Sequence, residues 1–342
     1  MKKIVIAISL IYISIQIHAQ DIQYSQYYEN PLYLNPAFTG SIPANRLVVN
    51  HRIQWPNLPN VFSNSSASYD ANIHALNSGF GVLVNADKAG SANLRSTSVS
   101  FNYAYNVNFN DQWVFRPALS FGLVSRDIDY QNLLFGDQID FNVDGAPSMD
   151  PDALFIDGSN YFDFSSGALI YNKNLWIGIA FFHMNEPNNS LLTEDSVLPM
   201  KLTLHGGARI PLDKGLFRGE RYPSASPGFI YKQQGSFKQL DVGSSFNYQP
   251  FSIGLWYRGL PFFEPIPNQS SHEAIILVFG LEYENFHFGY SFDMNISKLG
   301  ANSGGAHEFS LQYLFKINSK PKKVAKKQKL LQCPAFLNKT YN

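Results

Sequence analysis

Clustered aspartates are the residues of this sequence with the most evident chemistry. Segment 126–160 holds Asp127, Asp129, Asp137, Asp140, Asp144, Asp150, Asp152 and Asp157. Calcium takes about six to eight oxygen ligands, and carboxylates supply them in many sites. The spacing of these aspartates matches no EF-hand loop, however. The segment is therefore interpreted as a solvated, acidic external loop that caps a pore or contacts a partner, and no metal site is predicted.

Histidine, cysteine and serine give no enzymatic pattern. The eight histidines and one cysteine form neither an H-E-x-x-H nor a C-x-x-C arrangement. His183, His205, His287 and His307 fall near the ends or on the polar faces of the strands described below. A G-x-S-x-G nucleophile elbow is also missing from the sequence. We therefore predict that the chain is not an enzyme and that it uses no cofactor.

The charge of the chain is low and unevenly distributed. Only 15% of the 342 residues are charged, against about 25% in soluble domains. The 26 basic and 26 acidic residues give a net charge of zero, which argues against a nucleic-acid partner. Residues 20–315 carry 16 basic and 26 acidic residues, a net charge of −10, whereas residues 316–342 carry eight lysines and no acid.

The first 19 residues have the features of a secretory signal peptide. Lys2 and Lys3 precede a mostly apolar run, Ile4 to Ile17, which is followed by the small residue Ala19. The run is too short for a membrane-spanning helix, which needs about 20 apolar residues. Cleavage near Ala19 would leave Gln20 at the start of the mature chain. Cys333 has no second cysteine to pair with, and we interpret it as an incidental tail residue.

The positioning elements are strands with strict alternation of apolar and polar residues. Val99, Phe101, Tyr103 and Tyr105 alternate with small or polar residues, and Phe309, Leu311, Tyr313 and Phe315 alternate with Glu308, Ser310 and Gln312. A period of two gives a strand one apolar and one polar face. In an outer-membrane barrel the apolar face contacts lipid and the polar face lines the lumen.

Fourteen such strands are predicted, most of about the length that crosses a membrane at a tilt. They lie near 46–54, 67–75, 79–87, 96–108, 113–125, 161–171, 175–184, 200–210, 225–232, 237–248, 251–260, 274–283, 286–294 and 307–315. Most links alternate between short and long, as periplasmic turns and external loops do; links 211–224 and 233–236 are exceptions. The fold class is thus a transmembrane antiparallel β-barrel of about 14 strands, in the outer membrane.

The barrel is flanked by two segments of different character. Residues 20–45 contain Asn30-Pro31 and Asn35-Pro36, which favour fixed turns over a strand. We predict that this segment is a plug or a periplasmic surface, with the barrel at 46–315. Residues 316–342 form a basic tail, interpreted as mostly solvated and periplasmic because the strand number is even. Its predicted periplasmic contacts are Lys322, Lys323, Lys326 and Lys327.

Several phrases, in order over about 290 residues, resemble the PorP/SprF family of Bacteroidota. They are Asn30-Pro31-Leu32-Tyr33-Leu34-Asn35-Pro36-Ala37-Phe38-Thr39-Gly40, Arg52-Ile53-Gln54-Trp55-Pro56, Phe135-Gly136-Asp137-Gln138, His183-Met184-Asn185-Glu186-Pro187, Leu198-Pro199-Met200-Lys201-Leu202, Gly254-Leu255-Trp256-Tyr257-Arg258 and Gly304-Gly305-Ala306-His307-Glu308. The resemblance implies an outer-membrane barrel of the type IX secretion and gliding-motility system.

The resemblance also implies a partner. SprF-like members pair with a large cell-surface adhesin and support its export or surface retention through its C-terminal domain, so this domain, secretion-machinery components and outer-membrane lipid are the expected partners. The alternative is an outer-membrane transporter for hydrophobic small molecules, which the polar lumen faces disfavour. The predicted partner-binding residues are Asp137, Asp140, Arg116, Lys201, His205, Arg209, Asp241, Arg258, Asp293 and Glu308. Their more ordinary role is a network of ion pairs within the lumen.

Overall fold

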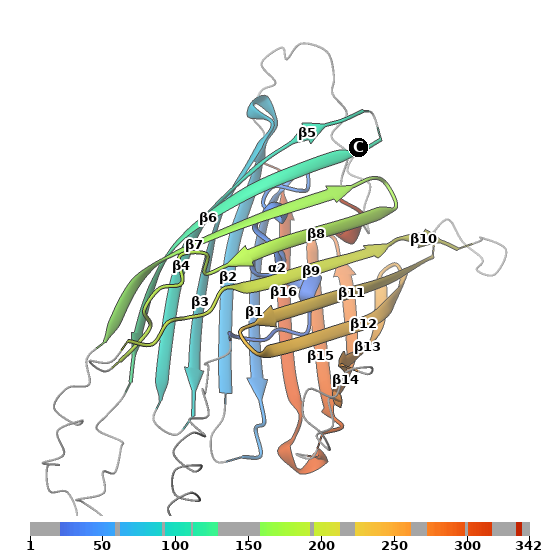
Figure 1. Cartoon of the computed structure of the whole chain (residues 1–342). Helices are drawn as coiled ribbons and strands as arrows, with labels where there is room; N and C mark the ends of the chain where they lie inside the picture. The colour runs from blue at the N-terminus through green and yellow to red at the C-terminus, as the bar shows by residue number, and fades with distance from the viewer. Residues whose placement is uncertain are drawn as a thin grey trace, which may run out of the picture.

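The computed structural model describes residues 21–58, 62–90, 93–110, 112–128, 158–191, 195–212, 223–260, 272–297, 300–316 and 333–336. Within them, fourteen long antiparallel strands follow one another around a closed barrel (Figure 1). The strands are β1 (Asn45–Gln54), β2 (Phe62–Ile73), β3 (Ser78–Ala89), β4 (Leu94–Tyr105), β6 (Val114–Asp127), β7 (Ser159–Tyr171), β8 (Leu175–Phe182), β9 (Lys201–Ala208), β11 (Ser224–Gln234), β12 (Phe237–Tyr248), β13 (Phe251–Gly259), β14 (His272–Tyr283), β15 (Phe286–Asn295) and β16 (Ala306–Phe315).

Two pairings close the barrel. β1 pairs with β16, from Asn45 opposite Phe315 to Gln54 opposite Ala306, and β9 pairs with β11. Two short strands extend the wall: β5 (Val107–Asn108) pairs with β6, and β10 (Ile210–Pro211) pairs with β11. The sequence prediction of an antiparallel barrel with about 14 strands is therefore confirmed.

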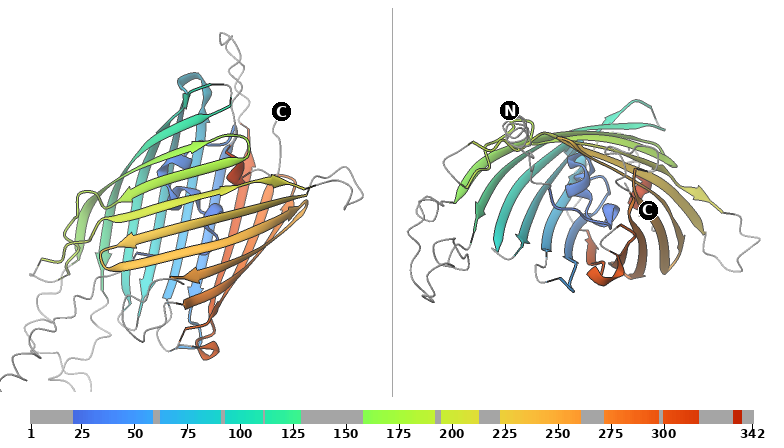
Figure 2. Two further views of the ribbon diagram at one scale, coloured as in Figure 1. Left: turned by 45° about the vertical axis from the view of Figure 1, so that its right-hand side comes forward. Right: turned by 60° about the horizontal axis from the view of Figure 1, so that its bottom comes forward.

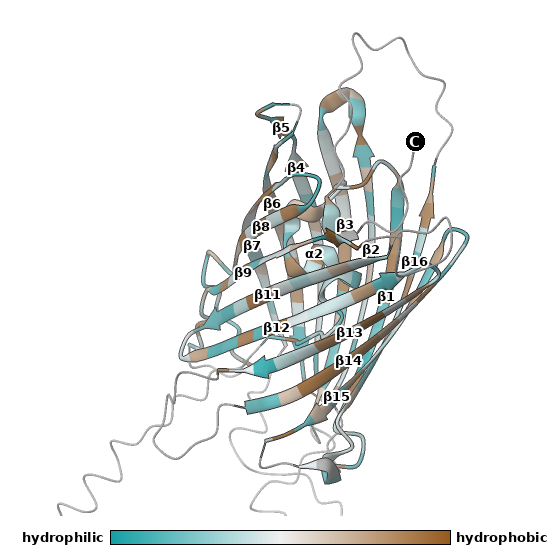
Figure 3. Cartoon of the chain, turned by 90° about the vertical axis from the view of Figure 1, so that its right-hand side faces the viewer, coloured by the Kyte–Doolittle hydropathy of each residue, from teal (hydrophilic) through white to brown (hydrophobic). Residues whose placement is uncertain are grey.

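Alternation along each strand separates the outer surface from the lumen. On β16, Phe309 and Leu311 are exposed, whereas Glu308, Ser310 and Gln312 are buried. Figure 3 shows apolar residues alternating with polar ones along the strands. Aromatic side chains also pack together on the outside; the rings of Phe286 and Tyr313, for example, lie 4.7 Å apart. An apolar outer face with aromatic clusters fits a lipid environment.

The two ends of the barrel differ in the links they carry. At the short-turn end, links 74–77, 172–174, 249–250 and 284–285 are short. At the long-loop end, links 128–158, 183–200, 260–271 and 296–305 are long. Two links at the long-loop end, 90–93 and 235–236, are also short; the first of these was not predicted.

The N-terminal segment lies inside the barrel, as Figure 2 shows. It contains the turns η1 (Tyr27–Glu29), α2 (Pro31–Leu34) and η2 (Pro36–Phe38). The two prolines begin α2 and η2, where the missing N–H costs no helical hydrogen bond. The prediction of fixed turns here is confirmed. We call residues 21–44 the plug.

A few residues of the C-terminal tail also lie inside the barrel. Cys333 is fully buried, and η7 (Pro334–Phe336) contacts β8 and β9. Cys333 belongs to an apolar cluster that includes Tyr27, Phe38 and Trp176. The interpretation of Cys333 as an incidental residue of a solvated tail is therefore wrong, because apolar packing holds this part of the tail in the barrel.

Among the described residues, the remaining short helices are η3 (His74–Leu76) and η6 (Ala301–Ser303), one at each end of the barrel. In the part of the chain that the structure describes, no helix is long and apolar enough to span a membrane.

Candidate functional site

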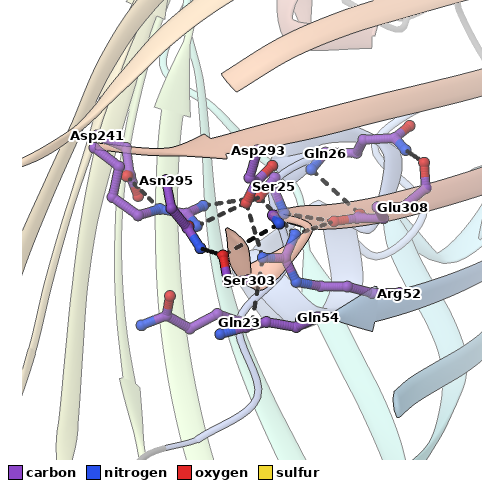
Figure 4. A network of polar contacts seen from close by, with 12 residues as sticks. Gln23, Ser25, Gln26, Arg52, Gln54, Asp241, Asp293, Asn295, Ser303 and Glu308 are labelled. Atoms are coloured by element: carbon purple, nitrogen blue, oxygen red, sulfur yellow. Dashed lines mark hydrogen bonds and ion pairs between the residues drawn. The ribbon is translucent and has the colours of Figure 1, made fainter. Parts of the chain in front are cut away.

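Buried ion pairs connect the barrel wall to the plug at one side of the lumen (Figure 4). Arg52 on β1 contacts Asp293 on β15 at 2.8 Å and Glu308 on β16 at 3.4 Å. Arg258 on β13 contacts Asp241 on β12 and Asp293, each at 3.0 Å. Arg258 can reach across β14 because its neighbour there is the small residue Ala274. The carboxylates thus have guanidinium partners, as buried charges require.

The plug completes this network with both main-chain and side-chain groups. The backbone N–H of Ser25 donates to Glu308 at 2.6 Å, and that of Gln26 donates to the same carboxylate at 3.2 Å. The Ser25 hydroxyl donates to Asp293 at 2.6 Å. Arg258 donates to the hydroxyl of Tyr27 at 2.7 Å. Removing the plug would leave buried charges of the wall with fewer partners, so wall and plug are energetically coupled.

Two further arginines hold the end of the plug nearest the short-turn end. Arg46 is paired with Asp70, directly opposite on β2, with 2.8 Å between Nε and Oδ1. Asp70 also accepts from the backbone N–H of Gly40 at 2.7 Å. Arg116 donates to the carbonyls of Ala37 and Thr39 and to Asn106. These side chains recognise the plug mainly through its backbone.

Glycines in the wall provide room for the plug. A Cβ at Gly167 would lie 2.2 Å from the Asn35 side chain, and one at Gly79 would lie 2.1 Å from the Thr39 carbonyl. Asn35 uses this close approach to donate to the carbonyls of Ala168 and Ile179, at 3.2 and 3.1 Å, and to contact His205. The wall is therefore shaped around this segment of the chain.

The first described residue, Asp21, is held toward the long-loop end. Its carboxylate contacts Lys201, His183 at 2.9 Å and Gln234 at 3.1 Å. His183 also contacts Asp163 at 2.9 Å. Burial lowers the pKa of His183, but the two aspartates outweigh this effect and raise it to about 9. Burial raises the pKa of Asp21, but His183 and Lys201 outweigh it and hold the pKa well below its usual range. We call these four charged residues, Asp21, Asp163, His183 and Lys201, the ionic latch.

Among the described residues, the cavities that border the plug include one at each end of the barrel. One, of about 140 Å³, lies toward the short-turn end, and its lining includes Tyr28, Trp176, Trp256 and Glu282. The other, of about 170 Å³, lies toward the long-loop end above Asp21, against β3, β4, β6 and β7. Among the described residues, no group of three or more His, Cys, Asp or Glu side chains is arranged to hold a metal ion.

The predicted partner-binding residues are mostly engaged within the chain. Seven face the lumen and are buried: Arg116, Lys201, His205, Asp241, Arg258, Asp293 and Glu308. Among them, Arg116, Lys201, His205, Arg258, Asp293 and Glu308 contact plug residues directly. Arg209 lies just after β9, where its backbone N–H donates to the Asn174 carbonyl at 2.7 Å. Asp137, Asp140, Lys322, Lys323, Lys326 and Lys327 lie outside the described residues.

Sequence reasoning missed Arg46, Arg52 and Asp70, which belong to the same networks. The signal was present on the first strand, where Arg46, Asn50 and Arg52 share a face under the alternation rule. Nothing in the local sequence indicated Ser25 or Gln26, because their contacts with Asp293 and Glu308 join residues more than 250 positions apart.

The chain matches one protein family in sequence and resembles outer-membrane proteins of known structure in fold. A family model described as "Type IX secretion system membrane protein PorP/SprF" matches residues 17–313. None of the curated proteins matches the chain. The P. putida toluene transporter TodX is 10% identical, with 83% of this chain and 93% of that chain covered and a TM-score of 0.43. The Acinetobacter baumannii outer membrane protein Omp33 is 7% identical, with 82% and 100% covered and a TM-score of 0.41. At these TM-scores, neither likeness carries a functional argument.

Proposed function

The chain belongs to the family of type IX secretion system membrane proteins PorP/SprF, and from this premise we propose that it is the outer-membrane partner of a secreted cell-surface adhesin. It binds the C-terminal domain of the adhesin and supports its export or surface retention, in connection with gliding motility. Secretion-machinery components contact it from the periplasm. The family match over residues 17–313 is the observation that carries this proposal.

The filled lumen supports a binding role over a conducting one. The plug occupies the interior with buried polar side chains such as Asn30, Asn35 and Thr39. Four arginines of the wall donate hydrogen bonds to the plug: Arg46, Arg52, Arg116 and Arg258. Three carboxylates of the wall accept hydrogen bonds from it: Asp70, Asp293 and Glu308. A lumen built to pass hydrophobic molecules would expose apolar side chains along a path. The alternative of hydrophobic transport is therefore disfavoured.

The exposure of the predicted partner-binding residues limits which of them a partner can contact. Arg116, Asp293 and Glu308 are at most 1% exposed, so they meet a partner only after the plug has moved. By analogy with barrels whose turns are periplasmic, the long-loop end is external. Asp137 and Asp140 belong to a link at that end, and we propose that they contact the adhesin. β16 ends at the short-turn end, and we propose periplasmic contacts for Lys322, Lys323, Lys326 and Lys327, which follow it.

A deletion strain and a purified complex test the proposal. The full-length barrel, in mild detergent, is expected to retain the purified C-terminal domain of the adhesin encoded beside it. Deleting the gene is expected to reduce surface display of that adhesin while a type IX cargo with an unrelated C-terminal domain is displayed normally. Recovery of the barrel alone, together with normal adhesin display in the deletion strain, would overturn the proposal.

A further inference from the structure

The cavity toward the long-loop end has a wall of small, uncharged polar side chains. We call it the vestibule and define it by six inward-facing residues on β3, β4 and β6: Asn85, Ser96, Ser98, Ser100, Asn102 and Ser120. Ser96, Ser98 and Ser100 are only partly buried although they face inward. The plug begins below them at Asp21, so these side chains line open space of about 170 Å³.

Two amide groups of the vestibule are buried without a partner among the described residues. Asn85 is 7% exposed, and its Oδ1 has no hydrogen-bond donor there, whereas its Nδ2 donates to Ser98 at 3.3 Å. Asn102 is 1% exposed, and its Nδ2 has no acceptor there. An unmade hydrogen bond of a buried amide is costly. One acceptor, Asn85 Oδ1, and one donor, Asn102 Nδ2, therefore lack a hydrogen-bond partner that a polar ligand could supply.

The rest of the lumen shows what kind of ligand such groups bind. Below the vestibule, Asn35 of the plug bonds to wall carbonyls, and wall side chains bond to the plug backbone. Glu308 accepts from two backbone N–H groups, and Arg116 donates to two carbonyls. The lumen therefore recognises irregular polypeptide by its main chain. The vestibule continues the same wall beyond Asp21, the first residue that the structure describes.

The charged side chains that line the vestibule are equal in number, with Asp21, Asp87 and Asp163 against Lys201, His183 and Arg126. Lys201 and His183 are paired with Asp21, and His183 also with Asp163. Asp87 accepts from Asn64 at 2.7 Å, and Arg126 donates to the Asn189 carbonyl at 3.3 Å. A ligand with a net charge would gain little here and would lose its hydration.

We propose that the vestibule binds an extended, uncharged segment of the exported partner through main-chain hydrogen bonds. The segment offers an N–H to Asn85 and a carbonyl to Asn102 and runs along the serines of β4. This inference rests on the proposed function and locates the partner's contact inside the mouth of the barrel, beside the plug.

Filling the vestibule tests the proposal, with the adjacent outward position as a matched control. Ser98→Trp places an indole in the cavity, whereas Val99→Trp places it on the exposed outer face of the same strand. With the purified C-terminal domain of the neighbouring adhesin as probe and the full chain in mild detergent, Ser98→Trp is expected to bind about tenfold more weakly or worse. Val99→Trp is expected to bind like the native chain.

A second measurement keeps the test decisive if Ser98→Trp does not fold. A benzophenone amino acid at position 98 is expected to crosslink to the C-terminal domain, and the same group at position 99 is not. If the native chain binds the domain but neither Ser98→Trp nor the crosslink distinguishes the two positions, the vestibule inference is wrong and the proposed function stands. If the native chain does not bind the domain, the proposed function itself fails. If chitotriose protects a Ser98→Cys thiol from labelling and the domain does not, the ligand is a glycan and the inference is overturned.

Discussion

Arg52 on β1 and Asp293 on β15 form a buried ion pair of 2.8 Å, although β16 lies between their strands. Both side chains are 2% exposed. The pair spans the closing seam of the barrel, where the first strand meets the last, and Ser25 of the plug contacts both residues. It therefore couples barrel closure to the seating of the plug.

The first prediction concerns this pair. Asp293→Asn removes the carboxylate shared by Arg52 and Arg258 and leaves each guanidinium with one carboxylate, Glu308 for Arg52 and Asp241 for Arg258. A hydrogen bond to a charged group contributes about 1.5–3 kcal/mol, so the free energy of unfolding in urea should fall by about that amount. Met294→Leu, at the adjacent exposed position on the outer face, is the control. Equal stability of the two variants would contradict the coupling.

The second prediction concerns the fit of plug and wall. A Cβ at Gly79 would meet plug backbone at 2.1 Å, whereas one at Gly122 would make only ordinary contacts, the nearest at 3.5 Å. Gly79→Ala should lower the free energy of unfolding by about 1–3 kcal/mol and speed hydrogen exchange in residues 21–44. Gly122→Ala should leave exchange unchanged. Unaltered exchange in Gly79→Ala would show that the plug is not seated as described.

The third prediction is a pH dependence of the ionic latch. The pKa of His183 is raised to about 9, so its stabilisation is full below its usual pKa, near 6.5, and is lost as the pH rises through about 9. The pKa of Asp21 is lowered, so its stabilisation is present above its usual value of 3.8 and is lost as the pH falls through the depressed pKa. The native chain should exceed Asp21→Asn in thermal stability most between about pH 4 and 6.5.

Unfolding temperatures of the native chain and Asp21→Asn, measured across this range, check the latch. The difference should shrink above about pH 7 and should not vanish, because Lys201 still contacts Asp21. A difference independent of pH would mean that His183 is not part of the latch.

The fourth prediction concerns the thiol in the barrel. Cys333 is fully buried, and burial raises its pKa to about 12. Because the thiolate is the reactive form, a maleimide should label folded chain slowly at pH 7 and unfolded chain quickly. The control is Lys173→Cys in a Cys333→Ser background, since Lys173 is exposed in a short turn. Equal labelling rates in the folded state would place Cys333 outside the barrel.

The strands were predictable because their signal is local. On β16, Glu308, Ser310 and Gln312 are buried and Phe309 and Leu311 exposed, as the alternation requires. The plug was partly predictable, since Asn30-Pro31 and Asn35-Pro36 exclude a strand. Cys333 was not, because apolar packing in the barrel places it there and the residues that it contacts lie far away in sequence.

The sequence by itself determined the barrel, its strand number and which face of each strand is polar, because a period of two is set by neighbouring residues and lipid tolerates only the apolar face. The tertiary structure alone decided which charges meet. Arg258 forms an ion pair with Asp293 across β14, and Glu308 accepts hydrogen bonds from the backbone N–H groups of Ser25 and Gln26. Such contacts depend on barrel closure and on the path of the plug, which bring together residues as far apart in sequence as Ser25 and Glu308, 283 positions.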